Sequence, residues 1–573
     1  MAKKISRSFI LLSLLCYLNS CQPGASSNDA IATDSGSIAA GEKSFNINCS
    51  GCHNFRQDAI GPQLSSLTKD VSPEWIKNFI RDPQLLINSR DEHALQLHDK
   101  YKTVMPSFAW LKQDEIKNII AFIHSHKENR AKKEHPNDNA LSNPIPEPIK
   151  LSDVTAGLQL VTQFPASSDS GKTPLARITE MKVQPNTNDL FVVDLRGKLY
   201  RLRNNKPIVY MDMAKLRHKF INEPGLATGF GSFAFHPEFF KNGLLYTTHT
   251  EAAQSGKADF DYADSIKVSM QWVLTEWKVN DPKAETFSGT GRELMRINMV
   301  TGIHGVQEIA FDPLSKKGDE DYGLLYIGVG DGGAVENGFQ FLAHDKGKIW
   351  GTILRIDPNI KGANGQLNLG QYGIPKTNPF VKDKNALGEI YAYGFRNPHR
   401  FTWSEKNGMI ACNVGHGNIE SVYIIKPGHD YGWPIREGSF LLNAYGDLNR
   451  IYSLPLNDSV YHITYPIAEY DHDEGKAISG GYEYLGTIAA LKGKFIFGDI
   501  PTGRLFYIDM ADMKRGKLAT IKEWQVSLNG EIKTLKQLCG NDRVDLHFGR
   551  DVKGELYIMT KADGKIYKLT GAQ

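Results

Sequence analysis

Residues 49–53 read CSGCH, and this pentad constrains the chain more than any other short stretch in it. In C-x-x-C-H, two thiols stand where they can add across the two vinyl groups of a haem, while the adjacent imidazole can bind the iron. Cys49 and Cys52 are therefore the predicted thioether residues, and His53 is the predicted proximal ligand. Two other interpretations stay open, a redox-active C-x-x-C pair and half of a zinc site, although zinc would need a second Cys/His pair nearby.

The sixth iron ligand is predicted from the methionine content of the same segment. Met105 is the only methionine between the pentad and residue 181, and Pro106 follows it. A thioether opposite a histidine is typical of haem proteins with a raised reduction potential. The alternative is a methionine that only fills the core.

Helical patterns accompany these ligands. Residues 73–83 and 114–126 carry apolar side chains at helical spacing, so residues 36–127 are predicted to form a small all-α domain. The pentad, the GPQL stretch at 61–64 and the helix after Met105 resemble class I cytochromes c. The resemblance implies a covalently bound haem c that relays single electrons, so the chemistry is expected elsewhere in the chain.

The first 21 residues are predicted to be an export signal. Lys3, Lys4 and Arg7 precede an apolar run that is too short to span a bilayer, and LNSC at 18–21 ends it. The pattern resembles a bacterial lipobox with Cys21 as the lipidated residue; an ordinary signal cleaved near Ser20 is the alternative. Both predict an exported protein, and the first predicts a lipoprotein anchored to a membrane, facing the periplasm or cell surface. Residues 22–35 are then a tether.

The remainder of the chain has a different composition and residue pattern. Residues 128–154 are charged and then Pro-rich, which predicts a linker, and 155–573 contain short apolar strands separated by Gly, Asn and Asp. Recurring strand-turn-strand units favour a β-propeller or a large sandwich. The formal net charge of +3 offers no basic field for nucleic acid. Cys412 and Cys539 could pair in an exported protein, but no local pattern decides it.

Six segments of this region, in order, resemble the soluble quinoprotein glucose/sorbosone dehydrogenases. That resemblance implies a multidomain chain in which the small all-α cytochrome c domain precedes an all-β six-bladed β-propeller that holds pyrroloquinoline quinone (PQQ) and Ca²⁺ at one mouth. The segments are FHPEFFKNGLLYTTHT (235–250), IHGVQEIAFDP (303–313), YIGVGDGG (326–333), GTILRIDP (351–358), YGFRNPHRFTW (393–403) and HDYGWP (429–434).

The resemblance also implies a catalytic pair. Oxidation of a sugar carbinol needs a base for the hydroxyl proton, and an imidazole oriented by a carboxylate suits that role. His304 matches the family's catalytic histidine, and Asp331 matches the carboxylate that positions it. The alternative for His304 is a packed or surface imidazole.

Cofactor contacts follow from the same resemblance. PQQ carries several carboxylates, which guanidinium groups bind well. Arg396 and Asn397 match the family's quinone-contacting pair, and Arg504 matches a further contact. Lys476 is a weaker candidate, for which a solvated charge is the preferred interpretation.

Two departures from the family pattern affect metal and substrate. The backbone carbonyls that hold Ca²⁺ fall at Gly415 and His416, and His416 stands where the family usually has proline. Ile303 replaces an acidic residue that glucose-specific members carry before the catalytic histidine, so glucose is not assumed as the substrate.

The sequence thus predicts an exported PQQ-dependent sugar (aldose) dehydrogenase that passes electrons from the quinone to its own haem and then to an external acceptor such as a cytochrome or quinone. The rival hypothesis is a non-catalytic propeller that binds sugars or a protein partner, with the haem domain serving another enzyme.

Overall fold

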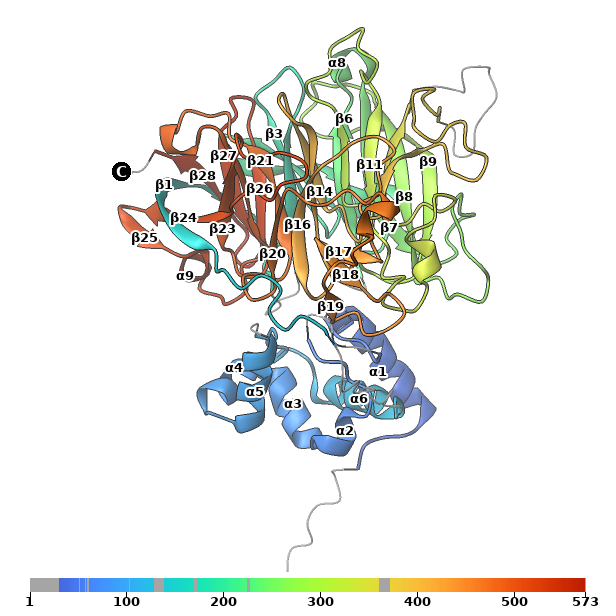
Figure 1. Ribbon diagram of the computed structural model, residues 1–573, viewed down its shortest axis with the longest axis vertical. Coiled ribbons are helices and arrows are strands. Elements are labelled where there is room, and N and C mark those ends of the chain that lie inside the picture. The colour runs from blue at the N-terminus through green and yellow to red at the C-terminus, as the bar shows by residue number, and fades with distance from the viewer. Residues whose placement is uncertain are drawn as a thin grey trace, which may run out of the picture.

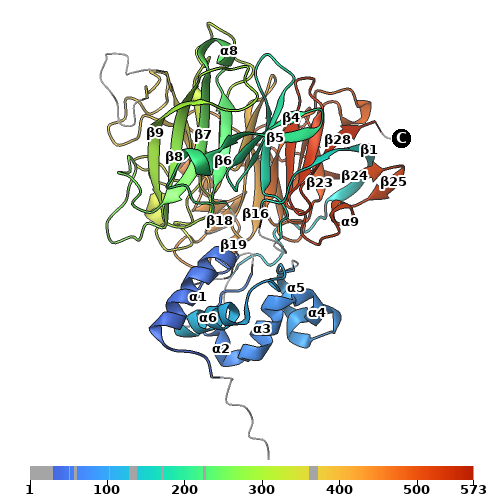
Figure 2. The same cartoon turned by 180° about the vertical axis from the view of Figure 1, so that it is seen from behind.

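The computed structural model describes residues 30–571, except 51, 57, 59–60, 102–103, 128–138, 169–172, 224–226 and 360–371. A helical N-terminal domain is followed by a much larger β-rich domain, as the sequence predicts. The helical domain lies at the ends of the strands of the β-rich domain, beneath it in Figure 1 and in the reverse view of Figure 2. Within the described residues, no helix is both long and apolar enough to cross a bilayer.

The helical domain is built around one apolar cluster. Asp34 caps the first helix by accepting a hydrogen bond from the Ser37 backbone N–H at 2.8 Å, and the side chain of Ser72 caps the third helix in the same way. The first and last helices pack closely at Gly41, where a side-chain carbon would collide with the backbone of Asn118. The helices are α1 (Ser35–Asn48), α2 (Leu67–Asp70), α3 (Pro73–Arg81), α4 (Pro83–Asn88), α5 (Glu92–Tyr101) and α6 (Gln113–Ser125).

The β-rich domain consists of consecutive runs of antiparallel strands. The first three runs comprise β2 (Ile178–Val183), β3 (Leu190–Asp194), β4 (Lys198–Arg203) and β5 (Lys206–Asp212); β6 (Phe230–Phe235), β7 (Leu244–Ala252), β8 (Met270–Val279) and β9 (Gly289–Met299); and β10 (Glu308–Phe311), β11 (Leu325–Val329), β12 (Thr352–Ile356) and β13 (Ile390–Tyr393). Short helices α7 (Met213–Leu216) and α8 (Phe239–Asn242) lie in their connections.

The later runs contain two irregularities, an inserted small sheet and a strand from the start of the domain. They comprise β14 (Arg400–Ser404), β15 (Gly408–Asn413), β16 (Ile419–Ile424) and β20 (Ala468–Asp471), with β17 (Arg436–Glu437), β18 (Phe440–Leu442) and β19 (Ile451–Tyr452) inserted; β21 (Ile478–Glu483), β22 (Lys494–Asp499), β23 (Leu505–Asp509), β24 (Lys522–Leu528) and β25 (Glu531–Lys533); and β26 (Leu546–Arg550), β27 (Leu556–Thr560) and β28 (Lys565–Thr570), the last of which pairs with β1 (Lys150–Gln163). Helix α9 (Leu535–Cys539) precedes β26.

Strand β1 joins the beginning of the domain to its end. Its second half pairs antiparallel with β28, and its first half pairs parallel with β24. Because this pairing starts at Lys150, the β-rich domain begins inside the segment predicted as linker. The first strands of successive runs also contact one another, for example β2 with β26 and β6 with β10. The loops that precede these first strands therefore converge at one end of the domain.

The two cysteines of the β-rich domain do not form a disulfide. Both thiols are free: Cys412 is buried on β15, and Cys539 ends α9, packed against a different apolar cluster. The pairing that the sequence left open is absent because the two strand runs place these residues in separate parts of the core.

Candidate functional site

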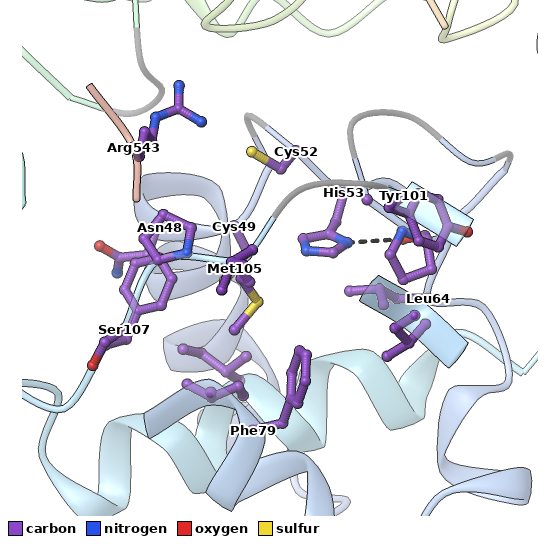
Figure 3. A pocket seen from close by; sticks show the side chains of 18 of the residues that line it. Asn48, Cys49, Cys52, His53, Leu64, Phe79, Tyr101, Met105, Ser107 and Arg543 are labelled. Carbon is purple, nitrogen blue, oxygen red and sulfur yellow. Dashed lines mark hydrogen bonds between the residues drawn. The ribbon is translucent and has the colours of Figure 1, made fainter. Parts of the chain in front are cut away.

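A cavity of about 440 Å³ in the helical domain contains the residues of the pentad. Cys49 is the C-cap residue that follows α1, and the backbone N–H groups of Cys52 and His53 both donate to its carbonyl oxygen at 3.0 Å, which forms a tight turn. Cys49, Cys52, His53 and Met105 all line the cavity, and Figure 3 shows their side chains around it. The structure thus brings the four predicted haem residues together.

The orientation of His53 suits an iron ligand. Its Nδ1 lies 2.8 Å from the carbonyl oxygen of Pro62, drawn as the dashed line in Figure 3. Because a carbonyl only accepts, Nδ1 carries the proton and Nε2 keeps the lone pair that binds iron. Burial lowers the pKa of His53, although the hydrogen bond to Pro62 opposes it, so the ring stays neutral.

The cavity fits a haem in its lining as well as its ligands. Most of the wall is apolar, with Leu64, Ile76, Phe79 and Ile119 among the lining residues. Burial raises the pKa of Cys49 to about 12, which keeps the sulfur a thiol rather than a metal-binding thiolate. Among the described residues, no cluster of three or more His, Cys, Asp or Glu could hold a metal. The described residues therefore offer no second pair of ligands that would complete a zinc site with Cys49 and Cys52.

Gly61 is expected to be intolerant of substitution because a side-chain carbon there would collide with the imidazole of His53. We expect Gly61→Ala to displace the ring and weaken its bond to iron, so the haem stays attached while its reduction potential falls. Potentiometric titration, followed by the haem absorbance, measures the reduction potential. Gly36→Ala, where the added carbon meets only the flexible Asp34 side chain, is the control and should leave the potential unchanged.

His304 and Asp331 meet at one end of the β-rich domain. His304 lies in the connection from β9 to β10, and Asp331 follows β11. Their side chains join through Nδ1 and Oδ1 at 2.8 Å. Because the carboxylate only accepts, Nδ1 of His304 carries the proton and Nε2 is left as a base. The Asp331 side chain is completely buried, and that of His304 is 11 % exposed.

The carboxylate of Asp331 is itself held by donors. Oδ1 accepts from the Gly333 backbone N–H at 2.9 Å, and Oδ2 accepts from the indole Nε1 of Trp433 at 3.0 Å. His304 adopts a left-handed backbone conformation, with φ of 51°, which is uncommon for a residue with a side chain. Such local strain concentrates at functional sites, where the surrounding contacts maintain it.

Arg396 is the centre of a second buried group at the same end. Its guanidinium donates to the carboxylate of Glu336 and to the carbonyl oxygen of Gly415. His416 Nδ1 lies 3.1 Å from the same Glu336 oxygen. Burial acts to raise the pKa of Glu336, but Arg396 and His416 outweigh it and hold that pKa well below its usual range. The Asp331 backbone N–H donates to the Arg396 carbonyl at 2.7 Å, which ties this group to the His304–Asp331 pair.

Two buried nitrogens of this group have no hydrogen-bond partner among the described residues, Nε of Arg396 and Nε2 of His416. Orphaned buried nitrogens call for a polar ligand, and the carboxylates of an anionic quinone are suited to the guanidinium. Asn397 is buried next to Arg396 and its backbone N–H donates to Asn413 at 3.0 Å. The donor set therefore fits a quinone at this position.

The same residues do not fit calcium in this arrangement. The Gly415 carbonyl, one of the two predicted ligands, already accepts a hydrogen bond from the Arg396 guanidinium. Glu437 holds the turn through the backbone N–H groups of residues 416–419, with Oε1 2.7 Å from the nitrogen of His416. A cation would have to displace a charged guanidinium from that carbonyl before the carbonyl could serve as a Ca²⁺ ligand.

The side-chain and backbone partners of Arg504 and Lys476 are different from those of the Arg396 group. The Arg504 guanidinium binds the carboxylates of Glu474 and Glu523 at 2.6 and 2.7 Å, which indicates a structural ion pair. Burial lowers the pKa of Lys476, and its backbone N–H donates to Asp499. Neither residue hydrogen-bonds to Arg396 or His304 within the described part of the chain.

The helical domain approaches the loop that carries this site. Arg56 follows the pentad, and a side-chain carbon at Gly338 would collide with its guanidinium. Gly338 belongs to the loop that begins at Asp331 and contains Glu336. The haem domain therefore lies at the end of the β-rich domain where His304 and Arg396 are found.

The sequence profile of the Glucose / Sorbosone dehydrogenase family matches residues 175–568, and the Cytochrome c profile matches 38–127. The chain belongs to the Glucose / Sorbosone dehydrogenase family. Its N-terminal domain is a cytochrome c domain.

Individual relatives are distant. The chain is 29% identical over 309 residues to the HIPL2 protein of Arabidopsis thaliana, a match covering 48% of this chain and 42% of that protein. It is 27% identical over 190 residues to aldose sugar dehydrogenase YliI of Escherichia coli, covering 30% and 44%. The match thus spans less than half the length of these relatives. The apo structure of the soluble aldose sugar dehydrogenase from Escherichia coli shares the fold, with a TM-score of 0.50 at 16% identity over 73% of this chain and 99% of that one.

Family motifs contain His304, Asp331 and Arg396, but not all of the groups that hold these side chains in place. Trp433 lies in the HDYGWP motif, so the family resemblance includes its position. Its hydrogen bond to the Asp331 carboxylate could not be predicted from that motif. Glu336 and Glu437 carry no sequence signal, because the groups that they contact, Arg396 and the turn at 416–419, are distant from them along the chain.

Proposed function

We propose that this protein is a PQQ-dependent sugar dehydrogenase that delivers electrons to its own haem c. The observation that carries the proposal is the His304–Asp331 pair, 2.8 Å apart and at the end of the β-rich domain that the cytochrome c domain approaches. An oriented imidazole supplies the base that carbinol oxidation needs, and a neighbouring haem supplies the electron exit.

We infer that the β-rich domain is a six-bladed propeller. Antiparallel runs that begin at β2, β6, β10, β14, β21 and β26 would form its blades, and β1 would complete the last blade by pairing with β28. Contacts between the first strands, such as β21 with β26 and β2 with β26, support a ring around a central axis. Closure would leave fewer sheet edges exposed than an open sheet of this length.

Each residue near the dyad has a definable task. Asp331 orients His304 through Nδ1, so Nε2 can take the hydroxyl proton of a sugar. Arg396 and Asn397 would hold the quinone, while Cys49, Cys52, His53 and Met105 would hold the haem. When bound, the quinone would supply a hydride acceptor and the haem a one-electron relay. Trp433 donates to the second carboxylate oxygen of Asp331, and this bond would keep the carboxylate from rotating away from His304.

Reconstitution tests the proposal. Haem-loaded protein without quinone is mixed with a panel of aldoses, and reduction of the haem is followed by absorbance after PQQ is added with or without Ca²⁺. We expect sugar-dependent reduction only after PQQ is added. Arg396→Lys keeps the charge that Glu336 requires but loses the bidentate fork, and it should raise the quinone concentration needed by about 10–100-fold.

Arg504→Lys is the matched variant for that experiment. Because Arg504 is bound by Glu474 and Glu523, we expect it to leave the quinone requirement unchanged. If Arg504→Lys raised the required quinone concentration as much as Arg396→Lys does, Arg504 would again be assigned as a quinone contact. Wild-type protein that binds PQQ but reduces no haem with any aldose would contradict the proposed activity.

One observation favours the rival function, a binding propeller without catalysis. Arg396 already has a carboxylate and a carbonyl as partners, so a quinone would have to share it with Glu336. Hedgehog-interacting protein of Mus musculus is among the relatives, at 24% identity over 381 residues. Failure to bind PQQ in the reconstitution, with the haem intact, would select this function.

We also propose that the protein is an exported lipoprotein whose haem passes electrons to an external acceptor. Cys21, the proposed lipid attachment site, lies outside the described residues. The short apolar run that ends in LNSC supports the proposal. A lipid on Cys21 would place the cytochrome c domain close to the membrane, where a quinone or a second cytochrome could accept electrons.

A further inference from the structure

The haem cavity is not closed by the cytochrome c domain alone. Part of its wall comes from the β-rich domain, in loops that precede β2, β6 and β26 or follow β3. These are connections at the end of the β-rich domain that the cytochrome c domain approaches. The lining residues of the β-rich domain are Ser168, Thr173, Pro174, Arg177, Arg196, Glu223, Arg543 and Asp545.

Arg543 occupies the edge of the cavity near the second thiol of the pentad. Figure 3 shows its guanidinium and the Cys52 sulfur at the same end of the cavity. Cys52 is the residue that would form the second thioether, so Arg543 faces the edge at which that haem is attached. An isolated cytochrome c domain would lack this cation.

Arg543 is held in place by Asp545. Its Nε donates to Oδ1 of Asp545 at 2.7 Å, and the two side chains are 19 and 6 % exposed. The Arg543 backbone N–H donates to Asn541 at 2.9 Å, which fixes the turn before β26. Burial works to lower the pKa of Arg543, but the Asp545 carboxylate outweighs it and raises that pKa above its ordinary value, so the guanidinium stays charged.

The pair places two opposite charges in the wall of the haem cavity. Reduction of a ferric haem removes one positive charge, so a nearby cation favours the ferrous form and a nearby anion favours the ferric form. Because both groups are largely shielded from solvent, water screens their fields less than it screens surface charges.

We propose that Arg543 and Asp545 of the propeller are positioning residues of the haem site, with Arg543 raising and Asp545 lowering the haem's reduction potential. The cytochrome c domain then depends on the β-rich domain for its potential as well as for its electrons. The inference rests on the haem of the proposed function and not on sugar oxidation.

The test is a potentiometric titration of the haem in the full-length protein, with a chemical reductant and no sugar. At a fixed ambient potential, Arg543→Gln should lower the ferrous-to-ferric ratio by about tenfold, or ~59 mV for a one-electron couple. Asp545→Asn should shift the ratio in the opposite direction. Arg543→Lys, which keeps the charge, should restore most of the wild-type potential.

Arg203→Gln is the control for removal of a guanidinium. Arg203 also pairs with carboxylates, Asp189 and Glu285, but does not line the haem cavity, so its loss should leave the potential unchanged. The inference is overturned if Arg543→Gln and Asp545→Asn match this control, or if both shift the potential in the same direction, as loosened docking would cause. If the protein oxidises no sugar but the opposite shifts appear, the proposed activity fails and this inference stands.

Discussion

Replacing His304 by alanine is expected to slow sugar-dependent reduction of the haem by about 10²–10⁴-fold, the usual cost of removing a general base. Within the described part of the chain, the imidazole is the only side chain that hydrogen-bonds to the Asp331 Oδ1 atom, and its Nε2 is the basic atom that this bond leaves available. The rate is measured by stopped-flow absorbance with PQQ and aldose saturating. Quinone affinity should change little, because Arg396 keeps its own contacts.

His462→Ala is a suitable control for this variant. His462 also has a left-handed backbone conformation, with φ of 53°, but it is exposed, so it reports the cost of placing alanine in that region without loss of a base. His304→Asn adds a second test, since asparagine tolerates the left-handed conformation but offers no basic nitrogen. Turnover at the wild-type rate in both His304 variants would reject the general base and favour the binding propeller.

The sequence predicted what short motifs determine. The pentad gives Cys49, Cys52 and His53 directly because haem attachment requires fixed spacing along the chain. Helix spacing likewise anticipated α6, since Ile116, Ile119, Ile120 and Ile123 all lie in the buried cluster. His304 and Asp331 were found only through the family pattern, and their 2.8 Å contact depends on two loops of one strand run.

The sequence could not predict contacts that depend on how strand runs and domains are placed. Glu336 reaches Arg396 across two connections, and no local pattern marks a glutamate in a glycine-rich loop as its partner. Arg543 is still farther from Cys52 along the chain, and the two meet only because β26 returns beside β2 and the cytochrome c domain docks at that end. Such contacts depend on the placement of whole strand runs and domains, to which many weak preferences contribute.

Replacing both Cys49 and Cys52 by serine is expected to abolish covalent haem attachment, because no thiol then remains in the cavity to form a thioether. Haem staining after denaturing electrophoresis measures the loss. The helical domain should also become less stable, since its apolar cavity of about 440 Å³ would lack the group that fills it, whereas the β-rich domain has separate apolar clusters.

The matched control is Cys412→Ser with Cys539→Ser, because both thiols are free and both lie in the β-rich domain. That variant should keep a full complement of covalent haem, although burial of Cys412 makes some loss of stability there expected. Met105→Ala separates attachment from ligation: the thioethers should form, while the low-spin absorbance is lost and the potential falls. Covalent haem that survives removal of Cys49 and Cys52 would place the attachment outside the pentad. Loss of the haem only in the Cys412 and Cys539 variant would assign haem attachment to the β-rich domain, and the cavity of the helical domain would then have to bind another group.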